Sequence, residues 1–272
     1  MTSTAAVGAA QAAETRFRLS GAGSHAVLAP IGLGVVLLGA WEFGVRLFDI
    51  DPFVVPAPAA IAGEVLENLP TICSGSVVTG RNALAGLLIG AVVGVLAALV
   101  SSASRVLDQM AAPVVAALSV VPIVALAPVL YTMFGAAADT ARILVAALSV
   151  VVPVYLNTLR GLRQVLPVHR DLMRAYAARP AWVASTVTLP TAVPFVFTGL
   201  RIASSLAVIS ALIAEYFGGP IGGLGKSITS AAAGSDYALA WAYVFGSIVL
   251  GLTFYVATLA AELWFTRHRA TT

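Results

Sequence analysis

Long apolar runs constrain this chain more than any other feature. A helix needs about 20 residues, rising 1.5 Å each, to cross a hydrocarbon core of about 30 Å. Six runs meet that length, over residues 27–48, 77–101, 108–134, 140–160, 191–217 and 238–266. Backbone groups in hydrocarbon must form their hydrogen bonds within their own segment. The sequence therefore predicts an all-α integral membrane protein with six transmembrane helices.

Charged residues are too few to cover a water-soluble globule. Of the 272 residues, 60% are apolar and 10% are charged, whereas soluble domains carry about 25% charged residues. With the N-terminus inside, ten of the fifteen basic residues fall on the cytoplasmic side and four on the outer side. This asymmetry predicts that both termini are cytoplasmic. We expect tails over 1–26 and 267–272 around a transmembrane domain over 27–266, and the net charge of +3 gives no indication of nucleic-acid binding.

The first apolar run and the segment after it are both informative. The run is longer than the core of a signal peptide, and Asp49 and Asp51 follow it in place of a small-residue cleavage site. We expect it to be retained as a span. The next segment opens with three prolines and then has helical apolar spacing over 59–69. A short helix at the outer surface is expected there, with an irregular loop as the alternative.

Glycine and proline mark the second and third spans. Gly86, Gly90 and Gly94 stand four residues apart, which predicts a stripe that lets another helix approach closely. The third span contains three prolines, at positions 113, 122 and 128. Proline removes a backbone hydrogen bond and kinks a helix. The third span is therefore either a broken helix that lines a cavity or a packed, bent helix.

The fifth span has the most polar face. On a helix, Thr198, Ser204, Ser205 and Glu215 fall on the same side as Arg201. An arginine inside a span costs about 2.5–3.5 kcal/mol in insertion assays, so it should face protein or water. This face is either part of a pathway or dimer interface, or Arg201 extends toward the cytoplasmic edge.

Motifs for catalysis and metal binding are absent from the sequence. The three histidines are scattered, and no His-Glu-x-x-His or Gly-x-Ser-x-Gly pattern occurs. Residues 219–227 imitate a phosphate loop, but Pro220 stands where its first glycine should be. We expect a flexible outer loop or a shallow re-entrant turn there, so neither an enzyme nor an ATP-binding chain is predicted. A stand-alone secondary transporter remains an alternative, although only Arg201 approaches the ionisable midplane residues that ion coupling needs.

The stretch 161–190 decides the interpretation. Five basic residues fall between positions 160 and 179, and the stretch ends in Leu189–Pro190. It resembles the coupling loop of permease subunits of binding-protein-dependent ABC importers, whose motif runs from Glu-Ala-Ala through Gly to Ile-x-Leu-Pro. Asp171, Leu172 and Met173 stand at Glu-Ala-Ala, Ala177 at the glycine and Val187 at the isoleucine. With alanine at the glycine position, Pro180 is expected to supply the break.

Similarity to this family extends from about residue 50 to 265. Segments 113–135, 153–158, 198–201, 214–215 and 223–225 resemble the nitrate, sulfonate and taurine branch. The Asp-Leu-Met-Arg stretch at 171–174 and the Glu-Tyr-Phe-Gly-Gly-Pro stretch at 215–220 are closer to permeases for thiamine-type pyrimidines or riboflavin. The resemblance therefore leaves two substrate classes open: nitrate, sulfonate or taurine, and thiamine-type pyrimidines or riboflavin.

The resemblance implies a type I ABC importer permease in a bacterial inner membrane. It implies a homodimer in lipid, an extracytoplasmic solute-binding protein near 49–76 and 217–237, and two cytoplasmic ATPase subunits docked on 163–182. ATP and Mg²⁺ would belong to the ATPases, with no cofactor on this chain. A short helix over 163–178 would present an apolar face of Leu172, Met173 and Tyr176 to the ATPase. The alternative is a basic loop that only holds topology. The coupling residues implied are Asp171, Leu172, Met173, Arg174, Tyr176, Ala177, Pro180, Leu189 and Pro190.

Overall fold

The computed structural model describes residues 22–135, 138–219 and 222–267, and it divides the chain into two units, residues 1–63 and 64–272. The described residues form helices joined by turns, without strands. The predicted tails lie mostly outside the described residues. The first helix begins at Ala22, so the tail expected over 1–26 is helical at its end.

The first unit contains α2 (Ala22–Leu47) and most of α3 (Pro58–Glu67). Glu42 of α2 accepts a 2.9 Å hydrogen bond from the backbone N–H of Ala59, and it pairs with Arg46 at 2.6 Å. A carboxylate is favoured at a helix N-terminus, so Glu42 fixes where α3 begins. The short helix expected over 59–69 is confirmed, and the alternative of an irregular loop is wrong.

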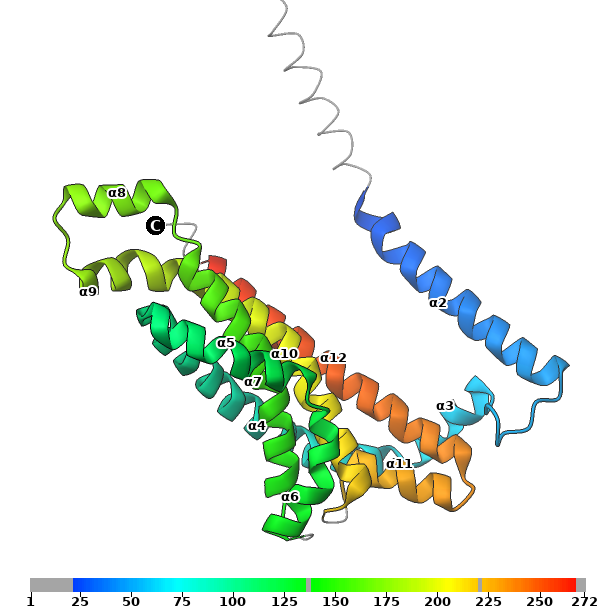
Figure 1. Ribbon diagram of the computed structural model, residues 1–272. Coiled ribbons are helices and arrows are strands. Elements are labelled where there is room, and N and C mark those ends of the chain that lie inside the picture. The colour runs from blue at the N-terminus through cyan, green and yellow to red at the C-terminus, as the bar shows by residue number, and fades with distance from the viewer. Residues whose placement is uncertain (1–21, 136–137, 220–221, 268–272) are drawn as a thin grey trace, which may run out of the picture. The chain divides into compact units, whose positions relative to one another are not determined.

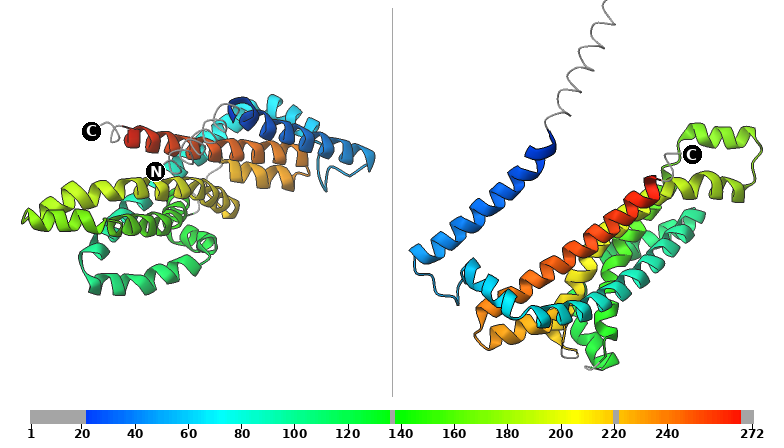
Figure 2. Two further views of the ribbon diagram at one scale, coloured as in Figure 1. Left: turned by 90° about the horizontal axis from the view of Figure 1, so that it is seen from above. Right: turned by 180° about the vertical axis from the view of Figure 1, so that it is seen from behind.

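The core of the second unit is a bundle of α4 (Leu69–Ala103), α7 (Thr140–Arg163) and α10 (Leu189–Phe217). Small and β-branched side chains fill its centre, among them Ala83, Val150 and Ala207. The long α12 (Tyr237–Arg267) packs along α10, and the short α11 (Leu224–Ala233) crosses the end of the bundle (Figures 1 and 2).

The glycine stripe of the second span is confirmed as a close helix contact. A Cβ atom on Gly90 would lie 2.5 Å from the carbonyl oxygen of Ala147. On Gly86 it would lie 2.5 Å from the Cβ of Ala146, and on Gly94 it would lie 2.9 Å from the Val151 oxygen. Only glycine allows α4 and α7 to approach so closely.

The third expected span is broken, as one of its two alternatives predicted, and the alternative of a single bent helix is wrong. Residues 108–134 form α5 (Arg105–Val120), a turn, a 3₁₀ segment (Ile123–Leu126) and α6 (Ala127–Phe134), not one helix. Val121 ends α5 with φ −61° and ψ 125°. The residue before a proline is driven out of the helical region, so Pro122 sets the break. Pro113 stays inside α5.

Five helices in the described residues are long and apolar enough to cross a membrane. They are α2, α4, α7, the continuous run from Pro180 to Phe217, and α12. The first expected span is therefore α2. The second, fourth, fifth and sixth expected spans are α4, α7, α10 and α12 of the second unit. That the third expected span also crosses the membrane, through α5 and α6, stays a prediction.

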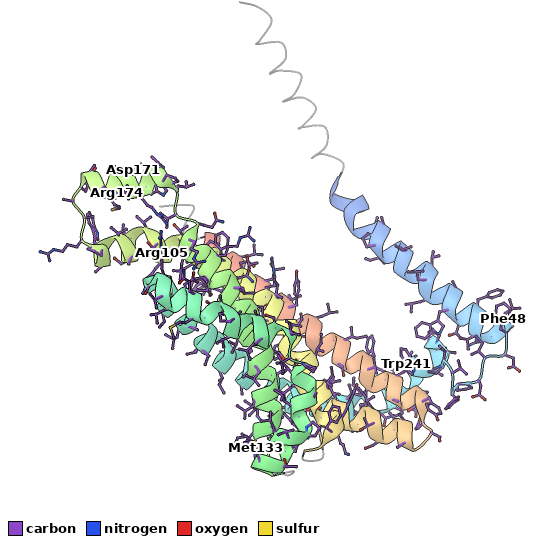
Figure 3. The ribbon with its side chains drawn as sticks, in the orientation of Figure 1. Phe48, Arg105, Met133, Asp171, Arg174 and Trp241 are labelled. Atoms are coloured by element: carbon purple, nitrogen blue, oxygen red, sulfur yellow. The ribbon has the colours of Figure 1, made fainter. Side chains whose placement is uncertain are left out.

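The bundle of the second unit has two chemically different ends. Asp171, Arg174 and Arg105 lie at one end, and Met133 of α6 lies at the other (Figure 3). The first end also carries most of the bundle's basic residues and the last turn of α12 (Figure 1). This distribution is the one expected from cytoplasmic placement of the first end.

Candidate functional site

The stretch between α7 and α10 begins with a short exposed helix, α8 (Pro167–Ala175). It ends in a tight turn. The N–H of Ala178 bonds to the Met173 oxygen at 3.0 Å, and the N–H of Ala177 bonds to the Arg174 oxygen at 2.9 Å. These two bonds define a Schellman cap, whose C′ residue adopts a left-handed conformation. Ala177 does so, with φ 48°.

Ala177 thus makes the turn at the position where the family motif has glycine. The expectation that Pro180 supplies the break is wrong. Pro180 instead begins the next helix, α9 (Pro180–Val183), where a missing N–H costs nothing. Arg179 before it is extended, with ψ 146°.

A π-helical turn, η2 (Ala184–Thr188), connects α9 to α10. The N–H of Leu189 bonds to the oxygen of Ala184, five residues back. Pro190 follows and has no N–H to continue the pattern. The Leu-Pro pair of the motif therefore marks the junction between the π turn and α10, and such turns are frequent at functional sites.

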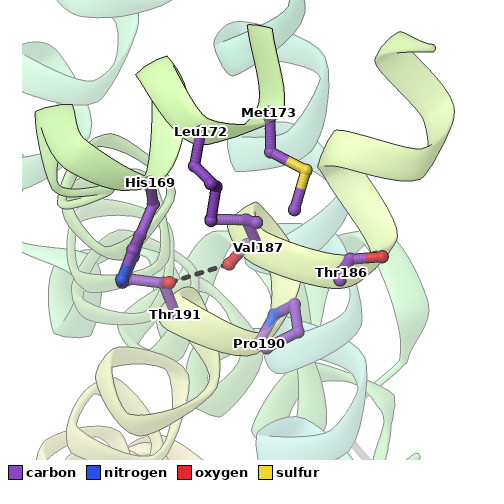
Figure 4. Close-up of a pocket in the computed structure, with 7 residues that line it drawn as sticks. All are labelled: His169, Leu172, Met173, Thr186, Val187, Pro190 and Thr191. Carbon is purple, nitrogen blue, oxygen red and sulfur yellow. Dashed lines mark hydrogen bonds between the residues drawn. The ribbon is translucent and has the colours of Figure 1, made fainter. Parts of the chain in front are cut away.

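A groove of about 370 Å³ separates α8 from the π turn and the start of α10. His169, Leu172 and Met173 of α8 point toward Val187 and Pro190 across it (Figure 4). Thr191 donates a 2.7 Å hydrogen bond to the oxygen of Val187. Leu172 and Met173, two residues of the expected apolar face, line this open groove, and Leu172 remains 49% exposed.

The outer surface of α8 and α9 is basic and partly apolar. Arg170, Arg174 and Arg179 are exposed, and Arg174 pairs with Asp171 at 3.1 Å. Tyr176 is 67% exposed and Trp182 is 50% exposed. Large apolar side chains beside charges are typical of a protein contact surface. We call residues 163–182 the coupling surface.

The polar face of the fifth span packs mainly against α12. Arg201 pairs with Glu262 at 3.2 Å, and the Ser204 and Thr258 hydroxyls lie 3.2 Å apart. Thr198 bonds to its own helix, at the oxygen of Pro194. Arg201 therefore faces protein, as expected for an arginine in a span.

Ser205 and Glu215 have different surroundings. Ser205 lines an apolar groove of about 530 Å³ between α10, α11 and α12. The Glu215 side chain is fully buried and contacts three other helices. The structure therefore does not bring the five predicted residues into one site.

Glu215 belongs to the Arg142–Glu215 cluster, which we define as Thr79, Asp139, Arg142, Glu215 and Gly225. Both oxygens of the Glu215 carboxylate lie 3.0 Å from the Thr79 hydroxyl, and one accepts the Gly225 N–H at 2.8 Å. Nη1 of Arg142 is 3.8 Å from Glu215 and 3.3 Å from Asp139. Arg142, Thr79 and Glu215 are each 0% exposed.

The glycine-rich stretch that imitates a phosphate loop packs against this cluster through its described residues; residues 220–221, where a flexible loop or re-entrant turn was expected, lie outside them. A Cβ atom on Gly219 would overlap the Arg142 guanidinium, and one on Gly223 would overlap the Glu215 carboxylate. Gly219 also has φ +104°, a conformation that favours glycine. The first turn of α11 therefore binds an anion after all, but that anion is a carboxylate of the same chain.

Sequence reasoning missed this cluster. Arg142 is one of the four basic residues that the charge asymmetry placed on the outer side, and helical spacing placed Glu215 on the same face as Arg201. The available signal was an arginine two residues inside the apolar run that begins at Thr140, together with a glutamate before a glycine-rich turn. Both charges needed a buried partner.

The family model described as binding-protein-dependent transport system inner membrane component matches residues 90–268. The chain belongs to this family. It is therefore an inner-membrane permease component of an ABC importer for a small solute, and it is not itself an enzyme. Membership excludes the alternative of a stand-alone secondary transporter.

Similar curated proteins have several substrates in their names. The riboflavin transport system permease protein RibX of Chloroflexus aurantiacus is 29% identical over 238 residues, covering 87% of this chain and 88% of that protein. The taurine transport system permease protein TauC of Escherichia coli is 30% identical over 223 residues, covering 76% and 78%.

A third relative and a solved structure agree with the family. A probable ABC transporter permease protein of Haemophilus influenzae is 29% identical over 192 residues, covering 71% of this chain and 78% of that protein. A crystal structure of an amino acid ABC transporter with histidines superimposes with a TM-score of 0.61 at 17% identity, covering 73% of this chain and 95% of that chain. The permease has the type I fold.

Proposed function

We propose that the coupling surface is the docking site of separate cytoplasmic ATPase subunits. The observation that carries this proposal is α8, a short exposed helix that stands between the two spans α7 and α10 with apolar and basic side chains outward. An ATPase can move the spans only through an element that leaves the membrane, and α8 is joined to α7 by residues 164–166 and to α10 through α9 and the π turn. The ATPases bind ATP and Mg²⁺, and this chain binds no cofactor.

The pathway forms between two copies of the chain, with lipid around them. A binding-protein-dependent permease receives its solute from an extracytoplasmic protein, which docks at the end of the bundle opposite α8. ATP binding drives the two copies into an outward-facing state, and hydrolysis resets them. The solute is a small polar or anionic molecule of the nitrate, sulfonate and taurine type or of the pyrimidine precursor and riboflavin type.

Charge reversal tests the docking site. Arg174→Glu places a negative charge on the coupling surface and should reduce co-purification of the ATPase at least about fivefold, since charge contacts at an interface contribute 1 kcal/mol or more when desolvated. Arg81→Glu is the matched control. Arg81 is also an exposed arginine paired with an aspartate, at 2.6 Å, but that aspartate, Asp139, precedes the first residue of α7, whereas the coupling surface follows its last.

Replacement of Asp171–Arg174 by four glycines is the stronger variant. It removes the middle of α8 and should abolish ATPase binding while the spans still insert. If binding and transport both survived the four glycines, the docking assignment would be wrong. If Arg81→Glu lost the ATPase equally, the effect of Arg174→Glu would reflect general misfolding.

A further inference from the structure

α10 joins the two ends of the permease as one helix. It starts at Leu189, beside the groove under α8, and it reaches Glu215 after 26 further residues, a rise of about 39 Å. Figure 1 shows it running from the α8 end of the bundle to α11. Displacement of its first turn is therefore carried to its last turn, provided that the helix moves as a rod.

The Arg142–Glu215 cluster fixes α11 to the far end of this rod. Glu215 of α10 accepts the N–H of Gly225 in the first turn of α11 at 2.8 Å. Thr79 of α4 donates to the same carboxylate, and its oxygen accepts the N–H of Leu224 at 2.9 Å. One hydroxyl thus bridges a carboxylate on α10 and a backbone amide on α11.

Packing around the cluster leaves α11 little freedom to slide. A Cβ atom on Gly225 would overlap the backbone oxygen of Leu212 on α10, so the two helices are in backbone contact there. Leu224 is 0% exposed and packs in an apolar cluster with Ile72 and Tyr243. A buried carboxylate that lost these partners would remain charged in a low-dielectric interior, which opposes separation of α11 from α10.

We propose that Thr79, Arg142 and Glu215 are positioning residues that make α11 move with α10, so that the ATPase acts on the opposite mouth of the pathway through this cluster. The proposal rests on the proposed function, because it needs an ATPase at the coupling surface. In this proposal, the glycine-rich turn binds the Glu215 carboxylate of the same chain. It also makes the Thr79 hydroxyl, and not merely its volume, necessary for transmission.

The test uses the complete complex of permease and ATPase in lipid nanodiscs. In a Cys73→Ser background, Ala232→Cys places one spin label on the exposed side of α11 in each copy. Pulsed electron paramagnetic resonance then measures the distance between the two labels, before and after the ATPase is trapped with Mg²⁺, ATP and vanadate. Trapping should shift this distance in the parent protein.

Two substitutions at position 79 separate transmission from folding. Thr79→Val keeps the shape but removes the hydroxyl and should lose the shift, while the complex still binds the ATPase and traps nucleotide. Thr79→Ser restores a hydroxyl and should recover the shift. Ser74→Ala, on the same helix, removes an exposed hydroxyl whose one hydrogen bond within the described part of the chain is to the Thr71 oxygen, and it should leave the shift intact.

The outcomes distinguish the two proposals. A Thr79→Val complex that traps nucleotide and shifts like the parent protein overturns the transmission role. So does a parent complex that traps nucleotide with no shift at α11. A parent permease that fails to bind the ATPase at all overturns the proposed docking site and, with it, this inference.

Discussion

Ala177 shows how a single side chain can disturb a motif without abolishing its geometry. Its φ of 48° lies in the left-handed region, which costs an L-residue about 1–2 kcal/mol relative to glycine. The two cap hydrogen bonds of α8 hold it there. Ser235, with φ 62°, is the corresponding residue after α11, so the chain uses this cap twice without glycine in its second unit.

Ala177→Gly should relieve this strain. Relief of about 1–2 kcal/mol of left-handed strain exceeds the chain entropy of about 0.5–1 kcal/mol that glycine costs. We therefore expect the turn to gain up to about 1 kcal/mol, which corresponds to up to about fivefold slower cleavage by a protease that depends on local opening. Limited proteolysis of the permease in nanodiscs measures it. Ala178→Gly is the matched control and should speed cleavage, because Ala178 has no positive φ to relieve.

Arg142 and Glu215 are coupled because each is buried against the other. Arg142→Met alone leaves the Glu215 carboxylate without its cation and should destabilise the protein by about 3–5 kcal/mol. The double variant with Glu215→Gln should cost less than the sum of the single variants by at least about 1 kcal/mol. Thermal unfolding in one detergent measures all three, and Arg81→Met, at an exposed arginine, should be neutral.

At the scale of helices, the contact between α4 and α7 depends on glycine. Gly90→Ala would place a methyl group 2.5 Å from the Ala147 oxygen and force the helices apart, at a cost of about 1–3 kcal/mol. Gly251→Ala in α12 has nothing within 4 Å of its new methyl group and should be neutral or stabilising. Equal melting temperatures for the two variants would contradict the close contact.

Sequence reasoning succeeded where the signal is local. Apolar run length located α2, α4, α7, α10 and α12 within a few residues, except that α4 begins eight residues before its expected span. Loop chemistry located α8. The division between α5 and α6 could be predicted only in part. Three prolines could each break the helix, and the sequence does not show that the break occurs at Pro122 while Pro113 stays inside α5.

Long-range pairing was beyond the sequence. Arg142 and Glu215 are 73 positions apart, and helical periodicity placed Glu215 on the face of Arg201. Helical periodicity shows which face of its own helix a side chain occupies, but it does not show which other helix packs against that face. That neighbour depends on the crossing of α7, α10 and α11, which only the folded bundle defines.

At the scale of the whole molecule, the two ends of the second unit have different tasks. The end with α8 is basic and partly apolar outside the bundle, as expected for a cytoplasmic contact surface. The opposite end buries one arginine and one glutamate, where the Arg142–Glu215 cluster joins four helices. α10 is common to both ends, so it is the element through which the ends communicate.

The most direct measurement is the sidedness of the coupling surface. In the Cys73→Ser background, Arg170→Cys should react with a membrane-impermeant maleimide in inside-out vesicles and be protected by added ATPase. Ala232→Cys on α11 should react only in right-side-out vesicles. Labelling of Arg170→Cys from the outside would contradict the account, because no cytoplasmic ATPase could then reach α8.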